Sequence, residues 1–212
     1  VRSGADEKTG LPVVSLYGQR KRPTPEMLAD IDLLVFDLQD VGTRFYTYIS
    51  SMHYLMEACA EEGKTFVVCD RPNPNDFIDG PILEPDCRSF IGVDPLPIAH
   101  GMTVGELALM IDGERWLRGG NTCHVKVIPM AGWSHGDPYE LPVRPSPNLP
   151  NSRSIELYPS LCFFEATIMS VGRGTSKPFQ AIGYPDKHFG SIVYTPQIKI
   201  GEDSNPRHKG RL

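Results

Sequence analysis

Short apolar runs alternate with stretches of helical periodicity along the first 130 residues. Apolar residues dominate the runs at 33–37, 65–69 and 124–128, which is typical of buried strands. Residues 46–62 place their apolar side chains on one helical stripe, and a second helix is predicted from residue 103 to about residue 117. This order predicts an α/β fold, namely a Rossmann-like, doubly wound parallel sheet with helices on both faces.

Helix-start signals and a further apolar run extend this pattern. Residues 13–17 predict an additional strand. Thr24 is the expected N-cap of a short helix in which Pro25 takes the first helical position. Thr103 and Glu106 have the spacing of a capping box, which supports the helix that follows them.

The remaining segments carry weaker signals. Residues 70–99 are predicted to form a long loop, residues 154–164 an ordered apolar segment and residues 191–194 a strand of a second domain. We therefore expect a Rossmann-like domain over residues 1–185 and the beginning of a smaller C-terminal α+β domain over residues 186–212.

The composition is that of a folded globular chain and argues against several classes of function. Of the 212 residues, 40% are hydrophobic and 22% charged. With a net charge of −5 and no basic run longer than residues 20–22, nucleic acid is not an expected partner. No apolar run approaches the ~20 residues of a membrane span. The five cysteines lack metal-binding spacings and are interpreted as buried thiols. The sequence contains no dinucleotide-binding, P-loop, serine-hydrolase or zinc-protease motif.

Polar side chains follow three of the four predicted strands. Asp37 and Asp40 come after one strand, Asp70 and Arg71 after the next, and a proline-rich loop ending at residues 144–148 after the last. Because the carboxyl ends of parallel strands share one edge of a sheet, we expect these groups to converge there. Carboxylates, arginines and tyrosines together suit a hydroxyl-rich ligand that bears a carboxylate, such as an acidic sugar.

Each candidate near the strand ends has a structural alternative. Arg44 is interpreted either as a clamp for a substrate carboxylate or as a partner of Asp40 that shapes the loop. Asp40 is equally suited to capping a turn. Asp70 and Arg71 fit a rigid binding loop or an internal ion pair. His100, which lies before a helix N-terminus, fits either donation to a ligand hydroxyl or packing.

Two further candidates lie later in the chain. Glu165 follows two aromatic residues, whose apolar walls would favour the protonated form that a general acid requires, but a buried acid bonded to backbone fits as well. Glycines flank Arg173, so that it could bind a carboxylate or simply occupy a turn. We expect Arg173 and the tyrosine-rich turn at residues 45–48 to gather on one rim of the fold.

Taken together, these segments resemble one family, the NamZ-type exo-β-N-acetylmuramidases, long known as a domain of unknown function. The matching segments are residues 11–18, 23–28, 35–48, 70–74, 79–81, 100–106, 145–150, 164–167 and 172–175 with Pro178 and Phe179. The resemblance extends from about residue 11 to residue 185. It implies a Rossmann-like domain and a smaller C-terminal domain with the active-site cleft between them.

The resemblance also implies an activity. Members of this family hydrolyse terminal, non-reducing N-acetylmuramic acid from peptidoglycan fragments, without a metal or organic cofactor. Peptidoglycan-derived saccharides are therefore the expected partners, in cell-wall recycling by bacteria. The expected location is extracytoplasmic, that is, periplasmic or secreted.

One departure from the family pattern concerns catalysis. The family's catalytic glutamate lies in an upstream Pro-Glu-His-Gly segment, and this sequence is expected to begin after that segment, to end early in the C-terminal domain and to be inactive alone. Glu165 and Asp40 remain as supporting catalytic candidates, which would assist a water or stabilise the oxocarbenium-like state. The expected substrate-binding residues are Asp37, Gln39, Arg44, Tyr46, Asp70, Arg71, Asn73, His100, Asn148 and Arg173.

Two other classes of function are also considered. One is a non-catalytic module that binds cell-wall sugars through the same cleft. The other is an α/β enzyme that processes nucleotide sugars or phosphates, which the glycine-flanked segment 172–175 motivates.

Overall fold

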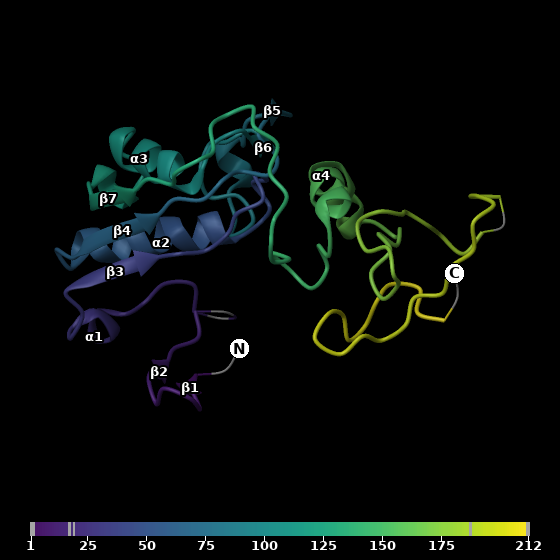
Figure 1. The fold of residues 1–212 in the computed structure, drawn as a ribbon, viewed down its shortest axis with the longest axis horizontal. Helices are drawn as coiled ribbons and strands as arrows, with labels where there is room; N and C mark the ends of the chain where they lie inside the picture. The colour runs from purple at the N-terminus through teal and green to yellow at the C-terminus, as the bar shows by residue number, and fades with distance from the viewer. Residues whose placement is uncertain (1–2, 17, 19, 187, 211–212) are drawn as a thin grey trace.

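The parallel sheet predicted from the apolar runs is present in the computed structural model (Figure 1). The structure describes residues 3–16, 18, 20–186 and 188–210. The sheet contains β3 (Leu33–Phe36), β4 (Thr65–Cys69) and β7 (His124–Ile128) in the order β3-β4-β7, and both pairings are parallel. The carboxyl ends of all three strands therefore lie at one edge of the sheet.

Two helices cover one face of this sheet. Helices α2 (Tyr48–Glu61) and α3 (Val104–Gly113) pack against β4 and against each other. The core between them and the sheet contains fully buried large side chains, among them Phe36, Met52, Met56, Phe66, Val68, Leu107 and Ile111. Every second strand residue points into this core, since side chains alternate between the faces of a sheet.

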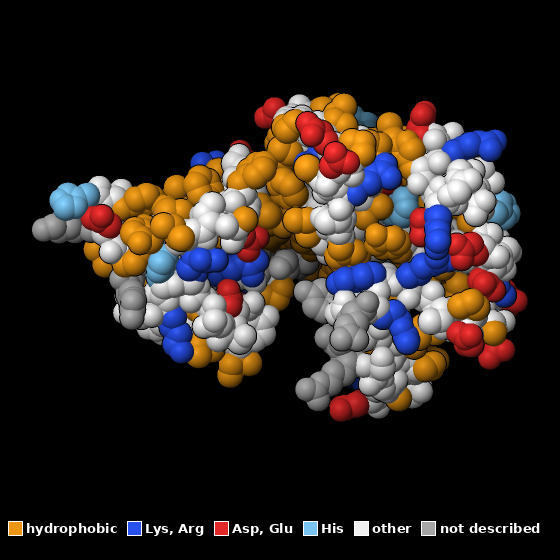
Figure 2. All heavy atoms as spheres, turned by 180° about the vertical axis from the view of Figure 1, so that it is seen from behind, with side chains coloured by type: hydrophobic (Ala, Val, Ile, Leu, Met, Phe, Trp, Pro, Cys, Tyr) orange, Lys and Arg blue, Asp and Glu red, His pale blue; other side chains and the backbone are white. Residues whose placement is uncertain are grey.

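The opposite face of the sheet differs from the expectation of helices on both sides. Leu33 and Val35 are 48% and 53% exposed, whereas their neighbour Phe36 on the other face is buried. Helices α2 and α3 both contribute to one core cluster, so within the described residues they lie on the same face of the sheet. Viewed from behind, hydrophobic side chains occupy much of the surface between the sheet-bearing part and the C-terminal part of the molecule (Figure 2).

A second, smaller core joins the loop after β3 to the C-terminal third of the chain. It is built around α4 (Ser152–Leu161), which continues into the 3-10 helix η3 (Cys162–Ala166). Its buried members are Val41, Leu149, Ile155, Tyr158, Val171 and Phe179. Because Val41 lies at the edge of the parallel sheet, this cluster holds the C-terminal segments next to the strand ends.

Helix caps agree with the sequence signals where the spacing was specific. Thr103 and Glu106 form the predicted capping box of α3. Asn151 and Ser154 form another at α4, which the sequence analysis did not identify. Helix α1 (Pro25–Leu28) begins at Pro25 as predicted, although Thr24 makes no side-chain cap bond. Among the described residues, no helix is both long and apolar enough to cross a membrane.

Two local predictions in the first hundred residues were wrong. Residues 13–16 do not join the parallel sheet: β2 (Pro12–Val13) instead pairs antiparallel with β1 (Gly4–Ala5), and Tyr17, the last residue of the predicted strand, lies outside the described residues. The loop at 70–99 contains regular structure, namely β5 (Ile78–Asp79) paired with β6 (Ala99–His100) and the 3-10 helix η1 (Pro85–Cys87). A further 3-10 helix, η2 (Arg118–Gly120), precedes β7.

Residues 191–194 form no strand in the part of the chain that the structure describes. Ile192 and Val193 are more than four-fifths exposed, so their β-branched side chains have neither a pairing strand nor a core to pack on. A short apolar run forms a strand only when a partner strand satisfies its backbone groups.

Asn75 connects the loop after β3 to α4. Its side chain is buried, and its Nδ2 donates to the carbonyl of Val41 and to the carbonyl of Ile155, both at 2.9 Å. Its backbone N–H donates to Asn73 Oδ1 at 2.9 Å. One amide group therefore satisfies two buried carbonyls that belong to segments 114 positions apart, at residues 41 and 155.

We predict that Asn75→Ala lowers the free energy of unfolding by about 2–4 kcal/mol, because it removes the described side-chain donor of the Ile155 carbonyl and leaves the Val41 carbonyl with only the longer bond from Thr43 Oγ1 at 3.4 Å. Urea denaturation followed by circular dichroism measures this change. Asn121→Ala is the control, since Asn121 is exposed. Equal stability of the two variants would show that Asn75 does not hold these segments together.

Candidate functional site

A groove lies at the edge of the sheet where the parallel strands end. Two adjoining cavities of about 540 and 360 Å³ share Asp37, Arg71 and Tyr139 in their walls. Asp37 directly follows β3, and Arg71 follows β4 by two positions. We call the combined cavity the strand-end groove. The convergence predicted from the parallel topology is thus present for these residues.

An exposed ion pair lies in the groove. Arg71 Nε and Nη2 both donate to Asp37 Oδ1, at 3.0 and 2.6 Å. The side chains of Arg71 and Asp37 are 40% and 55% exposed. An ion pair in water contributes little to stability, so a ligand carboxylate could compete with Asp37 for the guanidinium.

Asp70 has a different role at the same edge. Its Oδ1 accepts from the backbone N–H of Gly105 at 2.8 Å, and its Oδ2 accepts from Thr103 Oγ1 at 3.0 Å. The carboxylate therefore sits at the N-terminus of α3, where the helix dipole favours negative charge. Gly105 allows this approach, because a Cβ there would lie 2.6 Å from Asp70 Cγ. Asp70 anchors the helix to the end of β4.

His100 and Asp40 form a buried pair beneath the edge of the sheet. The backbone N–H of Met102 donates to His100 Nδ1 at 3.3 Å, which places the ring proton on Nε2, and Nε2 donates to Asp40 Oδ2 at 3.1 Å. The same oxygen accepts from the Gly42 N–H at 2.7 Å. Both side chains are at most 6% exposed. The pair fixes the turn after β3 to β6 and does not line the strand-end groove.

Arg44 also lies inside the protein. Its Nη1 donates to the carbonyls of Leu96 and Pro81, the latter at 3.0 Å, and its guanidinium lies 5.6 Å from the ring centre of Phe45. Burial lowers the pKa of Arg44. Its described hydrogen-bond partners are carbonyls rather than Asp40, so it supports the loop before β6, and its assignment to substrate binding stays a prediction.

Other predicted site residues hold the loops around the groove in place. Gln39 donates to the carbonyls of Asp40 and Pro72, at 2.8 and 2.9 Å, and so joins the loops after β3 and β4. Tyr46 donates its hydroxyl to the carbonyl of Pro145 at 2.6 Å, and burial raises the pKa of Tyr46.

The two predicted asparagines are also tied to the backbone. Asn73 donates to the carbonyl of Met102 at 3.1 Å, which joins the loop after β4 to the start of α3. Asn148 donates to the carbonyl of Glu202 at 3.0 Å, and so reaches the C-terminal segment. Both side chains are buried, and ligand contacts by either residue stay a prediction.

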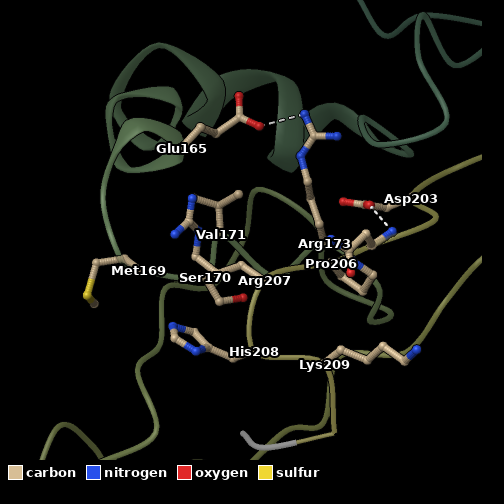
Figure 3. Close-up of a pocket in the computed structure, with 11 residues that line it drawn as sticks. Glu165, Met169, Ser170, Val171, Arg173, Asp203, Pro206, Arg207, His208 and Lys209 are labelled. Carbon is tan, nitrogen blue, oxygen red and sulfur yellow. Dashed lines mark hydrogen bonds and ion pairs between the residues drawn. The ribbon is translucent and has the colours of Figure 1, made fainter.

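Glu165 and Arg173 lie in a second cavity of about 640 Å³, which we call the C-terminal pocket. The two side chains point toward each other, and Arg173 Nη2 lies 2.6 Å from Glu165 Oε1 (Figure 3). The Arg173 guanidinium also lies 5.1 Å from the ring centre of Phe179. Glu165 therefore has a cationic partner in place of the purely apolar walls expected from its sequence context. Its catalytic role stays a prediction.

A row of aromatic rings connects the two regions. The ring centres of Tyr46 and Tyr158 are 6.2 Å apart, and those of Tyr158 and Phe179 are 5.0 Å apart. The guanidinium of Arg173 lies over the Phe179 ring. These ring contacts join the tyrosine-rich turn to Arg173 through the buried Tyr158 and Phe179, but the turn and Arg173 line two cavities rather than one. Of the predicted site residues, the groove contains Asp37, Gln39, Asp70 and Arg71, the C-terminal pocket contains Glu165 and Arg173, and the supporting interior contains Asp40, Arg44, Tyr46, Asn73, His100 and Asn148.

The loop after β7 supplies groove residues that the sequence analysis did not select. Trp133 and Tyr139 line the groove from this loop, and Tyr48 lines it from the start of α2. His135, in the same loop, lies between Asp76 and Glu106. The available signal was the position of this loop directly after a parallel strand, where aromatic side chains can serve as a wall for a ligand.

Comparison with known proteins relates both parts of the chain to one family. The family model described as exo-beta-N-acetylmuramidase NamZ, N-terminal, matches residues 1–153, and the one described as NamZ, C-terminal, matches residues 156–195. A peptidoglycan beta-N-acetylmuramidase NamZ from Bacillus subtilis (strain 168) is 52% identical over 191 residues, which cover 87% of this chain and 45% of that protein. The predicted domain division after residue 185 stays a prediction.

Two solved structures of DUF1343 family proteins from Bacteroides fragilis NCTC 9343 share the fold. One has a TM-score of 0.92 at 48% identity and covers 98% of this chain and 57% of that chain. The other has a TM-score of 0.80 at 43% identity and covers 84% of this chain and 48% of that chain. The chain therefore spans about half the length of the relatives that it matches.

We predict that Gly105→Ala lowers the free energy of unfolding by about 1–3 kcal/mol, because its Cβ would collide with the Asp70 carboxylate and with Val127. Gly113→Ala in the same helix is the matched control, since a Cβ there meets nothing within 4 Å. The control should be neutral or stabilising by about 0.5–1 kcal/mol. Urea denaturation measures both, and equal effects would argue against a close contact between Asp70 and α3.

Proposed function

The chain belongs to the exo-β-N-acetylmuramidase NamZ family, and from this premise we propose that it binds and hydrolytically releases terminal, non-reducing N-acetylmuramic acid from peptidoglycan fragments. Support comes from the 52% identity to the muramidase of Bacillus subtilis. The observation that carries the proposal is the exposed Arg71–Asp37 pair in an aromatic-walled groove at the strand ends. We further propose that the protein works outside the cytoplasm, in cell-wall recycling.

The groove has the features that a muramic acid residue requires. Trp133, Tyr139 and Tyr48 offer apolar ring surfaces for the faces of a sugar, and Gln39 and Asp37 offer polar groups for its hydroxyls and acetamido group. The lactyl carboxylate distinguishes muramic acid from glucosamine, so that a specific site needs a cation.

Arg71 is the best placed of the three arginines considered for this carboxylate. Arg44 is buried and bound to carbonyls, and Arg173 lies in the C-terminal pocket with Glu165. Arg71 is exposed in the groove, and both of its donated bonds go to a single oxygen of Asp37. Its planar guanidinium matches a carboxylate in two parallel hydrogen bonds.

The acids of the chain divide between structural and free positions. Glycoside hydrolysis commonly uses two carboxyl groups on either side of the scissile bond. Asp70 anchors α3 and Asp40 holds the turn after β3, so neither is free to transfer a proton without losing these bonds. We therefore assign ligand binding to the groove, and the general acid to the glutamate of the family's Pro-Glu-His-Gly segment, which the printed sequence does not contain.

This division of the acids favours one second candidate function. Because Asp40 and Asp70 are committed to backbone contacts, the groove is also suited to binding a cell-wall sugar without cleaving it. The phosphate-processing alternative is not supported by segment 172–175. A Cβ on Gly172 would collide with the carbonyl of Lys177, so that this glycine is needed for packing of the loop on itself.

We predict that a full-length protein, in which this chain is joined to the family's Pro-Glu-His-Gly segment, releases 4-nitrophenol from a 4-nitrophenyl β-N-acetylmuraminide and not from the corresponding N-acetylglucosaminide. The lactyl group is the only difference between the two substrates, so the comparison isolates its recognition. Absorbance at alkaline pH measures release, and calorimetry measures binding of free N-acetylmuramic acid. Binding without release would favour the sugar-binding candidate, and absence of both would contradict the proposed function.

We predict that Arg71→Ala weakens binding of N-acetylmuramic acid by about 10- to 100-fold, the range expected for loss of hydrogen bonds to a charged group. Binding of N-acetylglucosamine should change little, because it lacks the carboxylate. Arg153→Ala is the matched control, since Arg153 pairs with Glu156 on the exposed surface of α4. Equal losses for both sugars would reject the assignment of Arg71 to the lactyl group.

A further inference from the structure

His135 lies between two carboxylates that belong to different parts of the fold. Its Nδ1 is 2.6 Å from Asp76 Oδ1, and its Nε2 is 2.9 Å from Glu106 Oε1. Asp76 belongs to the loop after β4, and Glu106 belongs to the first turn of α3. The described residues show no hydrogen bond from either ring nitrogen to a carbonyl or hydroxyl group.

This geometry requires a particular protonation state. A neutral imidazole carries one N–H, so that it can donate to only one of the two acids, whereas an imidazolium carries two and can donate to both. Hydrogen bonds with Glu106 and Asp76 raise the pKa of His135, while partial burial opposes them. For Glu106, burial would raise the carboxyl pKa, but the bonds from Thr103 and His135 lower it overall.

The His135 imidazolium holds the loop that forms one wall of the strand-end groove against Asp76 and Glu106. Trp133 and Tyr139, on either side of His135, line the groove, and the Trp133 ring centre lies 5.2 Å from that of His135. The N–H of Gly136 donates to Asp76 Oδ2 at 2.6 Å. Trp133 Nε1 donates to the carbonyl of Asp137 at 3.0 Å, so that the aromatic side chain is tied to its own loop.

We propose that the doubly protonated His135 is a positioning residue, which clamps the aromatic wall at residues 133–139 onto Asp76 and Glu106 and thereby makes saccharide binding in the groove depend on pH. This inference rests on the proposed function, because it takes the groove as the sugar site. His135 is not among the residues that line the groove and acts through Trp133 and Tyr139.

The sign of the dependence follows from the groups around the ring. The charged groups bonded to the His135 ring are Asp76 from the loop after β4 and Glu106 from α3, and Asp137 lies in the loop itself. Asp37, Asp70 and Arg71 face residues 133–139 across the groove. Arg71 is paired with Asp37, so loss of the His135 proton leaves the carboxylates of Asp76 and Glu106 with no cation between them. Because the folded pKa is raised, the clamp is complete below the unfolded value of about 6.5 and weakens as pH rises through the folded value.

Trp133 provides a readout that needs no ligand. In a Trp116→Phe background, Trp133 is the only tryptophan of the printed sequence. An adjacent imidazolium quenches indole fluorescence, so emission should rise in one transition above about pH 6.5, with acrylamide quenching rising in parallel as the wall loosens. His135→Gln should abolish the transition. His188→Gln should retain it, since exposed His188 pairs with Asp186 in its own loop.

Binding measured over the same pH range tests the function of the clamp. The dissociation constants of N-acetylmuramic acid and neutral N-acetylglucosamine should both rise at least threefold across the fluorescence transition, and His135→Gln should remove this dependence. A change confined to the charged sugar would indicate simple attraction by the imidazolium and overturn the positioning role. A transition without any change in binding would also overturn it. If neither sugar binds at any pH, the proposed function fails, while acrylamide quenching of Trp133 still decides whether the clamp exists.

Discussion

The in-register parallel pairing of β3, β4 and β7 is the constraint from which the candidate site follows. Because all three strands run in the same direction, Asp37, Arg71 and the loop after β7 emerge at one edge, although they are spread over about a hundred positions of sequence. The core beneath the sheet, filled by Phe36, Phe66 and the apolar stripes of two helices, holds this pairing in place. The strand direction therefore brings the groove residues to that edge, and the contacts of the loops hold its walls.

Acidic residues near the groove fall into two groups with different physical environments. Asp40 and Asp70 each accept hydrogen bonds from backbone or side-chain donors. Asp40 thereby joins the turn after β3 to His100, and Asp70 joins the end of β4 to α3. Asp37 is more than half exposed and has only an arginine as its described partner. A buried carboxylate needs such partners to offset its lost hydration, whereas an exposed one remains available to a ligand. The strand-end groove thus rests on a rigid polar layer rather than on an apolar one.

The sequence predicted those features that depend on local patterns. The strands at 65–69 and 124–128 have the predicted bounds, because each is a short apolar run, and the Thr103–Glu106 capping box forms because its spacing alone determines it. Contacts between distant segments could not be predicted in this way. Whether Arg44 meets a carbonyl or a carboxylate depends on the loop 52 positions later, and His135 meets acids 29 and 59 positions earlier. Residues 191–194 have a strand-like pattern but no partner strand in the described structure.

The turn after β3 has a consequence for the order in which the protein folds. Arg44 N–H bonds to the carbonyl of Ile98, and His100 N–H bonds to the carbonyl of Gly42, so the turn is complete only when a loop of more than fifty residues has closed. Chain closure of this length is entropically unfavourable and slows the formation of the contacts that depend on it. The sheet and its two helices, built from nearer neighbours, can nucleate first. The turn beside the strand-end groove would then be the last part of the domain to become ordered, and the first to open under mild denaturing conditions.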